Sequence, residues 1–143
     1  MPASYWLLKT EPSTYNFSQL LKDRKTNWNG VRNYQARNFL RELKKDDLAL
    51  IYHSGDEKAV VGLAKVIKEA YPDLELKDGE KKGDWVQVDL APVKTASSPV
   101  ALAQLKAHPQ LKELKLVKHS RLSVSPVTAE QFKILAELAG VLK

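Results

Sequence analysis

The segment from Trp28 to Asn38 combines residue types suited to contact the backbone and bases of a nucleic acid. It places an aromatic ring, a glycine turn and two arginines around the expected start of a helix at Asn33. A helix N-terminus offers free N–H groups and a partial positive charge, which favour an anion. In one interpretation this edge contacts phosphate while Trp28, Arg32 and Asn33 reach bases. In the other it is a solvated basic face, and Trp28 and Tyr34 pack as core.

A histidine and a serine stand side by side in Tyr52-His53-Ser54-Gly55, at the end of an apolar segment. Neighbouring residues on a strand point to opposite faces, so His53 is badly placed to activate Ser54 as a nucleophile. The Gly-x-Ser-x-Gly turn that exposes a catalytic serine is also missing from the sequence. With three scattered histidines and no cysteine, no metal site is indicated. We expect His53 to be a hydrogen-bonding group in a pocket or a buried structural histidine.

A third polar segment, Lys118 to Pro126, alternates serines with apolar residues beside Arg121. Such serines either line a surface that contacts a ligand or lie on a solvent-exposed strand, and the sequence favours neither reading. The chain also carries three Trp and five Tyr, enough to wall a slot of nucleobase size. Stacking on such rings contributes about 1–3 kcal/mol per base. Most of these rings must nevertheless be core, because a small fold has few other residues of their bulk.

An excess of positive charge accompanies these segments. The 143 residues include 23 Lys+Arg and 17 Asp+Glu, a formal net charge of +6, and the pI is about 9.4. This balance favours an anionic partner, nucleic acid above all. Part of the charge falls on one stripe of the helix expected after Asn33, at Arg37, Arg41 and Lys44. The lack of cysteine excludes disulfides and thiolate chemistry, and no apolar run approaches the roughly 18 residues of a membrane span.

The elements that must position these residues show two periodicities. Asn16 caps a short helix that ends near Arg24, a full helix face runs from Asn33 to Leu43, and a weaker helical pattern covers 102–106. A capping box at Thr128 and Gln131 opens a last helix, which stops at Gly140. Strands are expected at 5–9, 48–53, 60–67, 86–90 and 121–125. The second and third are more continuously apolar than the others, as expected of strands that are buried on both faces or lie inside a small barrel.

This order of elements is not the alternation of a doubly wound fold. It favours the α+β class, with a small, mostly antiparallel β-barrel of five or six strands surrounded by short helices. The polar segment 76–84 carries two glycines between two expected strands, which indicates a hairpin loop and not a linker. Residues 1–143 are therefore expected to form a single domain.

Taken together, several motifs resemble the EVE domain family. The matching segments run in order, with compatible spacing, from about Ser4 to Gly140: YWLLKTEP, WNGVRNYQARN, DLALIYHS, VGLA, EAYPD and SRLSVSP. The resemblance implies a PUA-like fold, a small mixed-strand barrel with helices packed around it. It also implies a non-catalytic module without a cofactor, which binds nucleic acid carrying a modified base. That base, notably a modified cytosine in DNA, would be flipped into an aromatic-lined pocket.

The resemblance also suggests which residues form the site. The implied pocket walls are Trp6, Trp28 and Tyr52. The residues implied to read the base edge are Lys9, Thr10, Asn29, His53 and Ser54. The pocket rim is assigned to Ser120, Leu122 and Ser123, and phosphate contact to Arg32, Arg37 and Arg121.

Three alternative functions stay open on the sequence alone. One is a PUA-like module that binds RNA. A second is a small-molecule sensor that takes free modified nucleosides, or another planar ligand, into the same pocket. The third is an enzyme acting on a nucleobase or glycosidic bond, with Glu11, Asp73 and His53 as its only acid–base candidates. The chain lacks the long basic N-terminal extension expected of eukaryotic members, so we expect a cytoplasmic, monomeric protein without membrane contact.

Overall fold

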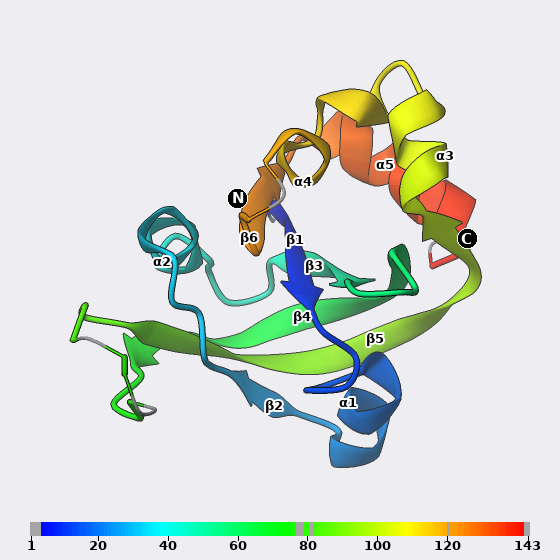
Figure 1. The fold of residues 1–143 in the computed structure, drawn as a ribbon. Helices are drawn as coiled ribbons and strands as arrows, with labels where there is room; N and C mark the ends of the chain where they lie inside the picture. The colour runs from blue at the N-terminus through cyan, green and yellow to red at the C-terminus, as the bar shows by residue number, and fades with distance from the viewer. Residues whose placement is uncertain (1–3, 77–78, 81, 120, 142–143) are drawn as a thin grey trace.

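The computed structural model describes residues 4–76, 79–80, 82–119 and 121–141. Within these residues a six-stranded sheet has the order β2-β5-β4-β3-β1-β6 (Figure 1). The strands are β1 (Tyr5–Thr10), β2 (Thr26–Trp28), β3 (Leu48–His53), β4 (Ala59–Pro72), β5 (Val86–Ala101) and β6 (Val124–Val127). β1 is parallel to β3, and the other neighbouring pairs are antiparallel. The helices are α1 (Phe17–Asp23), α2 (Tyr34–Leu40), α3 (Leu102–Ala107), the 3-10 helix η1 (Leu111–Glu113), α4 (Lys115–Lys118) and α5 (Ala129–Ala139).

The sheet is not closed into the barrel that the sequence led us to expect. β2 and β6 stand at opposite ends of the strand order, and no pairing joins them among the described residues. Both are short, with three and four residues, whereas β4 and β5 extend over 14 and 16 residues. The register between these long strands shifts at four places, and such irregularities bend a strand and increase its twist. The α+β class is confirmed, and the sheet is open.

Apolar side chains cover both faces of the central strands and form two cores. Trp6 of β1 belongs to the core shared with α1 and α2, whereas the next residue, Leu7, belongs to the core shared with α3, α4 and α5. β3 repeats this alternation, with Ile51 in the α1–α2 core and Tyr52 in the α3–α5 core. The prediction that residues 48–53 are buried on both faces is confirmed. Because successive side chains of a strand point to opposite faces, Trp6 can reach only the α1–α2 side of the sheet and Tyr52 only the α3–α5 side.

Most local signals of the sequence appear in the structure. The Asn16 side chain caps α1, and Thr128 opens α5 with a capping box. Four strands differ from expectation. β4 continues from the expected 60–67 as far as Pro72, β5 continues from the expected 86–90 as far as Ala101, and β6 begins only at Val124. The short strand β2 was not expected. The short elements η1 and α4 were not expected, because three or four residues do not show a helical period. In the part of the chain described here, no helix is long and apolar enough to cross a membrane.

Asp47 joins the first strand to the loop that precedes β3. It is 3% exposed. Its carboxylate accepts hydrogen bonds from the Ser4 N–H at 3.0 Å, the Trp6 Nε1–H at 2.9 Å and the Lys44 N–H at 2.9 Å. A carboxylate accepts all three because both of its oxygens carry lone pairs. These bonds orient the Trp6 ring and hold β1 beside the start of β3.

We expect Asp47→Asn to lower the free energy of unfolding by about 2–3 kcal/mol. The amide has a single acceptor oxygen, so its NH2 group must face at least one of these three N–H donors. Urea unfolding measures the loss. Asp56→Ala, in an exposed turn, is the control and should stay within about 0.5 kcal/mol of the parent protein. Unchanged stability in Asp47→Asn would contradict the role given to this carboxylate.

Candidate nucleic-acid interface

A cavity of about 400 Å³ lies where the end of β1 meets β2 and the loop after β2. We call it the Trp28 cavity. Its lining combines aromatic, charged and small polar side chains: Lys9, Thr10, Glu11, Thr14, Tyr15, Thr26, Asn27, Trp28, Asn29, Gly30, Val31 and Ser123. Its volume is within the range of about 300–1,000 Å³ that is usual for ligand pockets.

Two aromatic rings form one wall of the Trp28 cavity. Trp28 ends β2 and is 7% exposed, and Tyr15 meets it edge to face, with 6.3 Å between the ring centroids and an interplanar angle of 89°. The Tyr15 Oη donates to Asp23 Oδ2 at 2.8 Å, and the Tyr15 carbonyl accepts from Thr10 Oγ1 at 3.0 Å. Burial raises the pKa of the Tyr15 phenol, and the Asp23 carboxylate adds to the rise against the effect of Thr26. The wall is thus fixed before any ligand arrives.

Hydrogen-bonding groups of both kinds surround these rings. Lys9 is partly buried, and this burial lowers the pKa of its ammonium group. The Lys9 N–H donates to the Ser123 carbonyl at 2.9 Å, which holds the segment before β6 beside β1 and brings Ser123 to the cavity. Asn29 and Glu11 are exposed and line it as well. Lysine donates, a carboxylate accepts, and amide and hydroxyl groups do both, so the lining can match the polar edge of a nucleobase.

The structure brings together five of the residues predicted for the base pocket: Lys9, Thr10, Trp28, Asn29 and Ser123. They come from β1, from the end of β2 with its following loop, and from the segment before β6. Sequence reasoning missed Tyr15 and Glu11 as lining residues. One signal for Tyr15 is its position directly before the N-cap Asn16, where a large apolar residue commonly packs back against the helix or its neighbours.

Three other predicted pocket residues lie elsewhere. The Trp6 ring packs against Phe39, with 6.3 Å between the ring centroids, while its indole N–H is bound to Asp47. Tyr52 lies in the α3–α5 core, whereas Trp28 lies in the α1–α2 core on the other face of the sheet. Leu122 is buried in the α1–α2 core. In this structure all three are packing residues, because strand alternation and core formation decide their direction.

His53 and Ser54 do not line the Trp28 cavity, and His53 lines a separate cavity together with Phe17 and Glu57. The His53 Nε2 accepts from the Phe17 N–H at 3.0 Å, and its Nδ1 lies 2.7 Å from Glu57 Oε1. Because Nε2 accepts, the proton of the neutral ring is on Nδ1 and points to Glu57. His53 thus holds the start of α1. The Ser54 Oγ donates to the Thr10 carbonyl at 3.3 Å. The predicted rim residue Ser120 lies outside the described residues.

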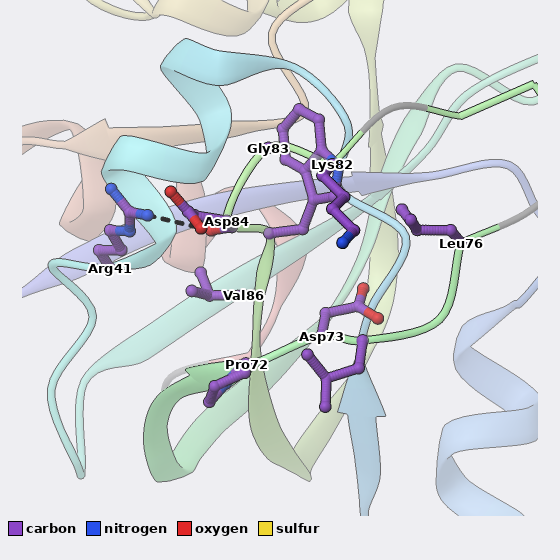
Figure 2. Close-up of a pocket in the computed structure, with 10 residues that line it drawn as sticks. Arg41, Pro72, Asp73, Leu76, Lys82, Gly83, Asp84 and Val86 are labelled. Atoms are coloured by element: carbon purple, nitrogen blue, oxygen red, sulfur yellow. Dashed lines mark hydrogen bonds between the residues drawn. The ribbon is translucent and has the colours of Figure 1, made fainter.

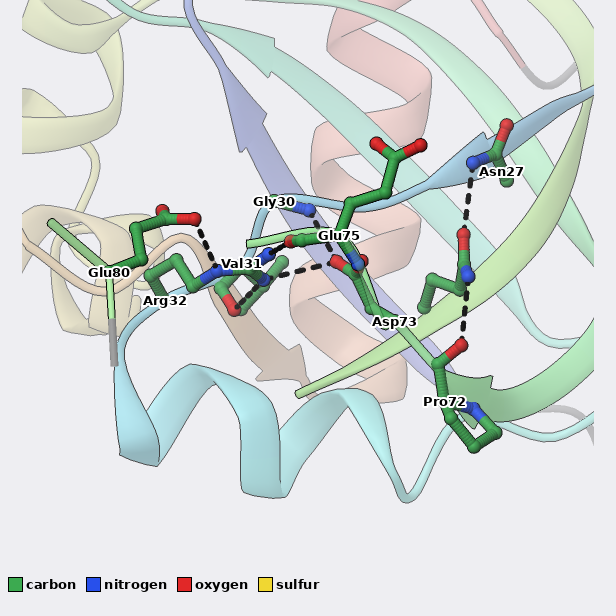
Figure 3. A network of polar contacts seen from close by, with 9 residues as sticks. Asn27, Gly30, Val31, Arg32, Pro72, Asp73, Glu75 and Glu80 are labelled. Carbon is green, nitrogen blue, oxygen red and sulfur yellow. Dashed lines mark hydrogen bonds and ion pairs between the residues drawn. The ribbon is translucent and has the colours of Figure 1, made fainter. Parts of the chain in front are cut away.

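A buried carboxylate, Asp73, holds the loop after β2 in place (Figure 3). Its side chain is 2% exposed. It accepts hydrogen bonds from the Gly30 N–H at 3.0 Å, from Arg32 Nη1 at 3.0 Å and from the Glu75 N–H at 3.2 Å. Burial tends to raise the pKa of Asp73, but the bonds from Gly30, Arg32 and Glu75 outweigh it and hold that pKa below its ordinary value. Asp73 is therefore a positioning group and not a proton donor near neutral pH.

The three arginines predicted to bind phosphate have different surroundings. Arg32 is paired with Asp73 and also lies 3.2 Å, through Nε, from Glu80 Oε1. Arg37 donates to carbonyl and amide oxygens, and Arg121 is exposed. In the part of the chain that the structure describes, no carboxylate forms an ion pair with Arg37 or Arg121. Positive charge is thus available at these two residues and is largely offset at Arg32.

Trp85 is one of the residues that line a second cavity, of about 530 Å³. Figure 2 shows this cavity from close by. We call it the Trp85 cavity. Asp73 lines it and at the same time binds Gly30, which lines the Trp28 cavity. The other lining residues are Arg41, just after α2, and residues of two segments on either side of the loop between β4 and β5. These are Pro72, Leu74 and Leu76 in the first segment, and Lys82, Gly83, Asp84 and Val86 around Trp85 in the second. Sequence reasoning did not place a site here, although a tryptophan directly after a polar, glycine-containing loop is a signal for one.

Residues 4–138 match the EVE domain family, and the chain belongs to this family, which confirms the resemblance drawn from its motifs. The chain is 35% identical to thymocyte nuclear protein 1 of Mus musculus, over 95% of this chain and 74% of the mouse protein. A protein of Rhodopseudomonas palustris, solved by NMR, is 40% identical, with a TM-score of 0.87 over 99% of this chain and 96% of that chain. Human THYN1, crystallised in complex with 5-methylcytosine-containing DNA, is 33% identical, with a TM-score of 0.82 over 99% of each chain.

We expect Asp73→Asn to destabilise the fold at pH 7 by about 2–4 kcal/mol, since it leaves Arg32 without its buried partner. The folded pKa of Asp73 lies below the unfolded value of about 3.9. Its ionised contacts therefore stabilise the fold above the unfolded pKa, and this stabilisation is lost as the pH falls through the folded pKa.

Urea unfolding of Asp73→Asn and the parent protein at pH 7 and pH 3 measures this effect. The difference between the two proteins should shrink at pH 3, while the exposed control Asp56→Asn should differ little from the parent at either pH. A difference of equal size at both pH values would show that the charge of Asp73 is not what holds the loop.

Proposed function

We propose that this chain is a non-catalytic module that binds DNA by holding a modified cytosine, flipped out of the base stack, in the Trp28 cavity. The observation that carries the proposal is the meeting of an aromatic wall with hydrogen-bonding groups of both kinds in a cavity of about 400 Å³. A relative supports it: human THYN1, 33% identical over 99% of this chain, was crystallised with DNA that contains 5-methylcytosine.

The energetics of base flipping fit this cavity. A flipped base loses stacking and pairing worth a few kcal/mol, which the protein must restore. Contacts with Trp28 and Tyr15 can return about 1–3 kcal/mol. Both rings are already fixed by neighbours in the free protein, so binding costs little side-chain entropy. A methyl group buried against an apolar side chain such as Val31 adds about 0.8 kcal/mol.

The polar lining can read the pairing edge of cytosine, which offers an amino donor and two acceptors. Lys9 and Asn29 supply donors for the acceptors, and Glu11 supplies an acceptor for the amino group. Desolvation of the Lys9 ammonium, seen in the lowering of its pKa, strengthens a hydrogen bond to a base oxygen because less water competes for it. The groups that read the base edge and the rings that stack on the base thus come from different segments of the chain, which meet at the Trp28 cavity.

The charge of the chain supplies the contact with the DNA backbone in this proposal. The formal net charge is +6, and neither Arg37 nor Arg121 is ion-paired to a carboxylate in the described residues. We assign phosphate contact to these two arginines. Arg32, which Asp73 and Glu80 neutralise, we assign to positioning of the loop after β2.

The acid–base candidates named from the sequence support a non-catalytic role. Asp73 accepts three hydrogen bonds, and both ring nitrogens of His53 have partners. Glu11 is left as a carboxylate at the cavity, without a second acid–base group among those candidates to act with it. A monomeric state and a cytoplasmic location stay predictions.

Replacement of the cavity wall tests the proposal most directly. Trp28→Leu keeps apolar bulk in the α1–α2 core but removes the ring that stacks on the base. We expect it to weaken binding to a short DNA strand with 5-methylcytosine by about 5- to 100-fold, and binding to the unmodified strand by a smaller factor, because the unmodified base is held less often in the cavity. Fluorescence anisotropy with labelled strands measures both dissociation constants.

The matched control is Tyr52→Leu, which removes a buried ring of the α3–α5 core and should leave both constants nearly unchanged in a folded protein. Equal losses on modified and unmodified strands in Trp28→Leu would overturn the assignment of the cavity. Two further ligands test the alternatives. Stronger binding of matched RNA would favour an RNA-binding module, and salt-independent binding of free 5-methylcytidine would favour a nucleoside sensor.

The phosphate assignment makes a separate prediction. Arg121→Ala should weaken binding to modified and unmodified strands by a similar factor and reduce the slope of log K against log salt by about 0.7–0.9. Titrations at several salt concentrations measure the slope. Lys133→Ala, an exposed cation on α5, is the control and should leave the slope as it is. An unchanged slope in Arg121→Ala would remove this residue from the interface.

A further inference from the structure

The Trp85 cavity has no part in the function proposed above, yet it has the composition of a binding site. Leu74 and Leu76 line it and are 86% and 42% exposed. Figure 2 shows their stretch of chain facing Lys82 and Gly83 across the cavity, with Asp73 below. Exposed leucines beside a tryptophan form an apolar surface without a described purpose in the fold.

The tryptophan of this cavity is held in a fixed stack. Its ring lies 5.0 Å from that of Tyr34, with 28° between the planes. The Arg32 guanidinium carbon lies 5.4 Å from the Trp85 ring centroid, and that of Arg37 lies 5.8 Å from it and 5.0 Å from the Tyr34 ring. Cations over the ring faces stabilise the stack. Trp85 itself is only 7% exposed, so a ligand in the cavity meets the small exposed part of a preorganised aromatic stack.

The charges around this surface suit an anion. Arg41 lines the cavity and donates through Nη2 to the Asp84 carbonyl at 3.0 Å (Figure 2). Within the described residues neither Arg37 nor Arg41 is ion-paired to a carboxylate. Lys82 adds a third cation. Of the two lining carboxylates, Asp73 is offset by Arg32, and Asp84 is exposed to solvent.

The two cavities are joined by one short segment. Gly30 and Val31 line the Trp28 cavity, and Arg32 follows directly. The Asp73 carboxylate, which lines the Trp85 cavity, binds both the Gly30 N–H and Arg32 Nη1 (Figure 3). A ligand that continues beyond the Trp28 cavity across this segment therefore arrives at Trp85.

We propose that the Trp85 cavity holds the nucleotide next to the modified one on the same strand. Its base lies against Trp85 and the exposed leucines, and its phosphate lies toward Arg41 and Lys82. This inference rests on the function proposed for the Trp28 cavity. Since the contacts offered here are apolar packing and charge, the cavity requires a base at the neighbouring position but accepts any of the four.

The three tryptophans of the chain allow the two sites to be observed separately. Each gives one indole N–H signal in a nitrogen–proton NMR spectrum, assigned by replacing each in turn with Phe. Trp28 reports the first cavity, Trp85 the second, and Trp6, bound to Asp47, serves as the internal control. The ligands are 5-methylcytidine monophosphate, a trinucleotide with 5-methylcytosine at its centre, and the same trinucleotide with an abasic 5′ or 3′ neighbour.

We expect the mononucleotide to shift the Trp28 signal alone, and the trinucleotide to shift those of Trp28 and Trp85. An abasic site on one of the two sides should abolish the Trp85 shift and weaken binding about fivefold or more. If Trp28 responds to every ligand and Trp85 to none, the neighbouring-nucleotide assignment is overturned and the proposed function stands. If Trp28 responds to none, both are overturned, whatever Trp85 does.

A variant at the surface keeps the inference testable where changes at Trp85 disturb the fold. Leu74→Ala removes an exposed side chain and should weaken binding of the trinucleotide about two- to fivefold. That effect should disappear when the neighbour on the responsive side is abasic, because the two changes remove the same contact. Leu138→Ala removes another exposed leucine side chain, 42% exposed on α5 and outside the cavity, and should have no effect. Equal affinity of Leu74→Ala and the parent protein for the trinucleotide would overturn the inference.

Discussion

The ion pair between Asp73 and Arg32 is the constraint on which the candidate interface depends. A carboxylate in this buried position is costly to desolvate, and it is kept ionised only because three donors, one of them a guanidinium, converge on it. Two of those donors belong to the loop after β2, so the charge fixes that loop against the end of β4. Asp73 therefore positions parts of both cavities: it lines the Trp85 cavity itself, and it binds Gly30, which lines the Trp28 cavity.

The open sheet explains why such a loop is available for binding. A closed barrel would pair its edge strands with each other, whereas here β2 pairs only with β5 among the described residues and leads directly into the loop. β1, by contrast, is fully enclosed between β3 and β6. The Trp28 cavity therefore combines a rigid central strand, which carries Lys9 and Thr10, with an edge strand that carries Trp28. The rigid strand fixes the polar groups, and the edge strand brings part of the largely buried Trp28 ring to the cavity.

Local patterns in the sequence predicted much of the fold, because helix caps and strand alternation are encoded by near neighbours. Asn16, Thr128 and the apolar strand 48–53 are examples. The closure of the sheet was not predictable in this way, since it depends on how long β4 and β5 become and where their register shifts. Charge neutralisation of Arg32 was equally hidden, because its partners Asp73 and Glu80 lie more than forty positions away.

The same limit applies to the candidate site. Motif matching named eleven candidate pocket residues, and five of them line one cavity in the structure: Lys9, Thr10, Trp28, Asn29 and Ser123. It did not separate Trp28 from Tyr52, because a pattern of alternation shows that two faces exist without showing which face holds a ligand. Tyr15 was missed for a related reason: it lies in a loop, where no periodicity marks a side chain that packs against Trp28.

Discrimination between modified and unmodified cytosine must arise inside the Trp28 cavity in this account. Contacts with phosphate and with a neighbouring nucleotide are made equally in both complexes, so they raise affinity and cancel from the ratio. Burial of one methyl group gives about 0.8 kcal/mol, or about a fourfold preference. A larger preference requires that the walls do not close around the smaller base, since an unfilled void adds a penalty of its own. Tyr15, fixed by Asp23 and Thr10, and Val31, in a loop that Asp73 anchors through Gly30 and Arg32, provide such rigid walls.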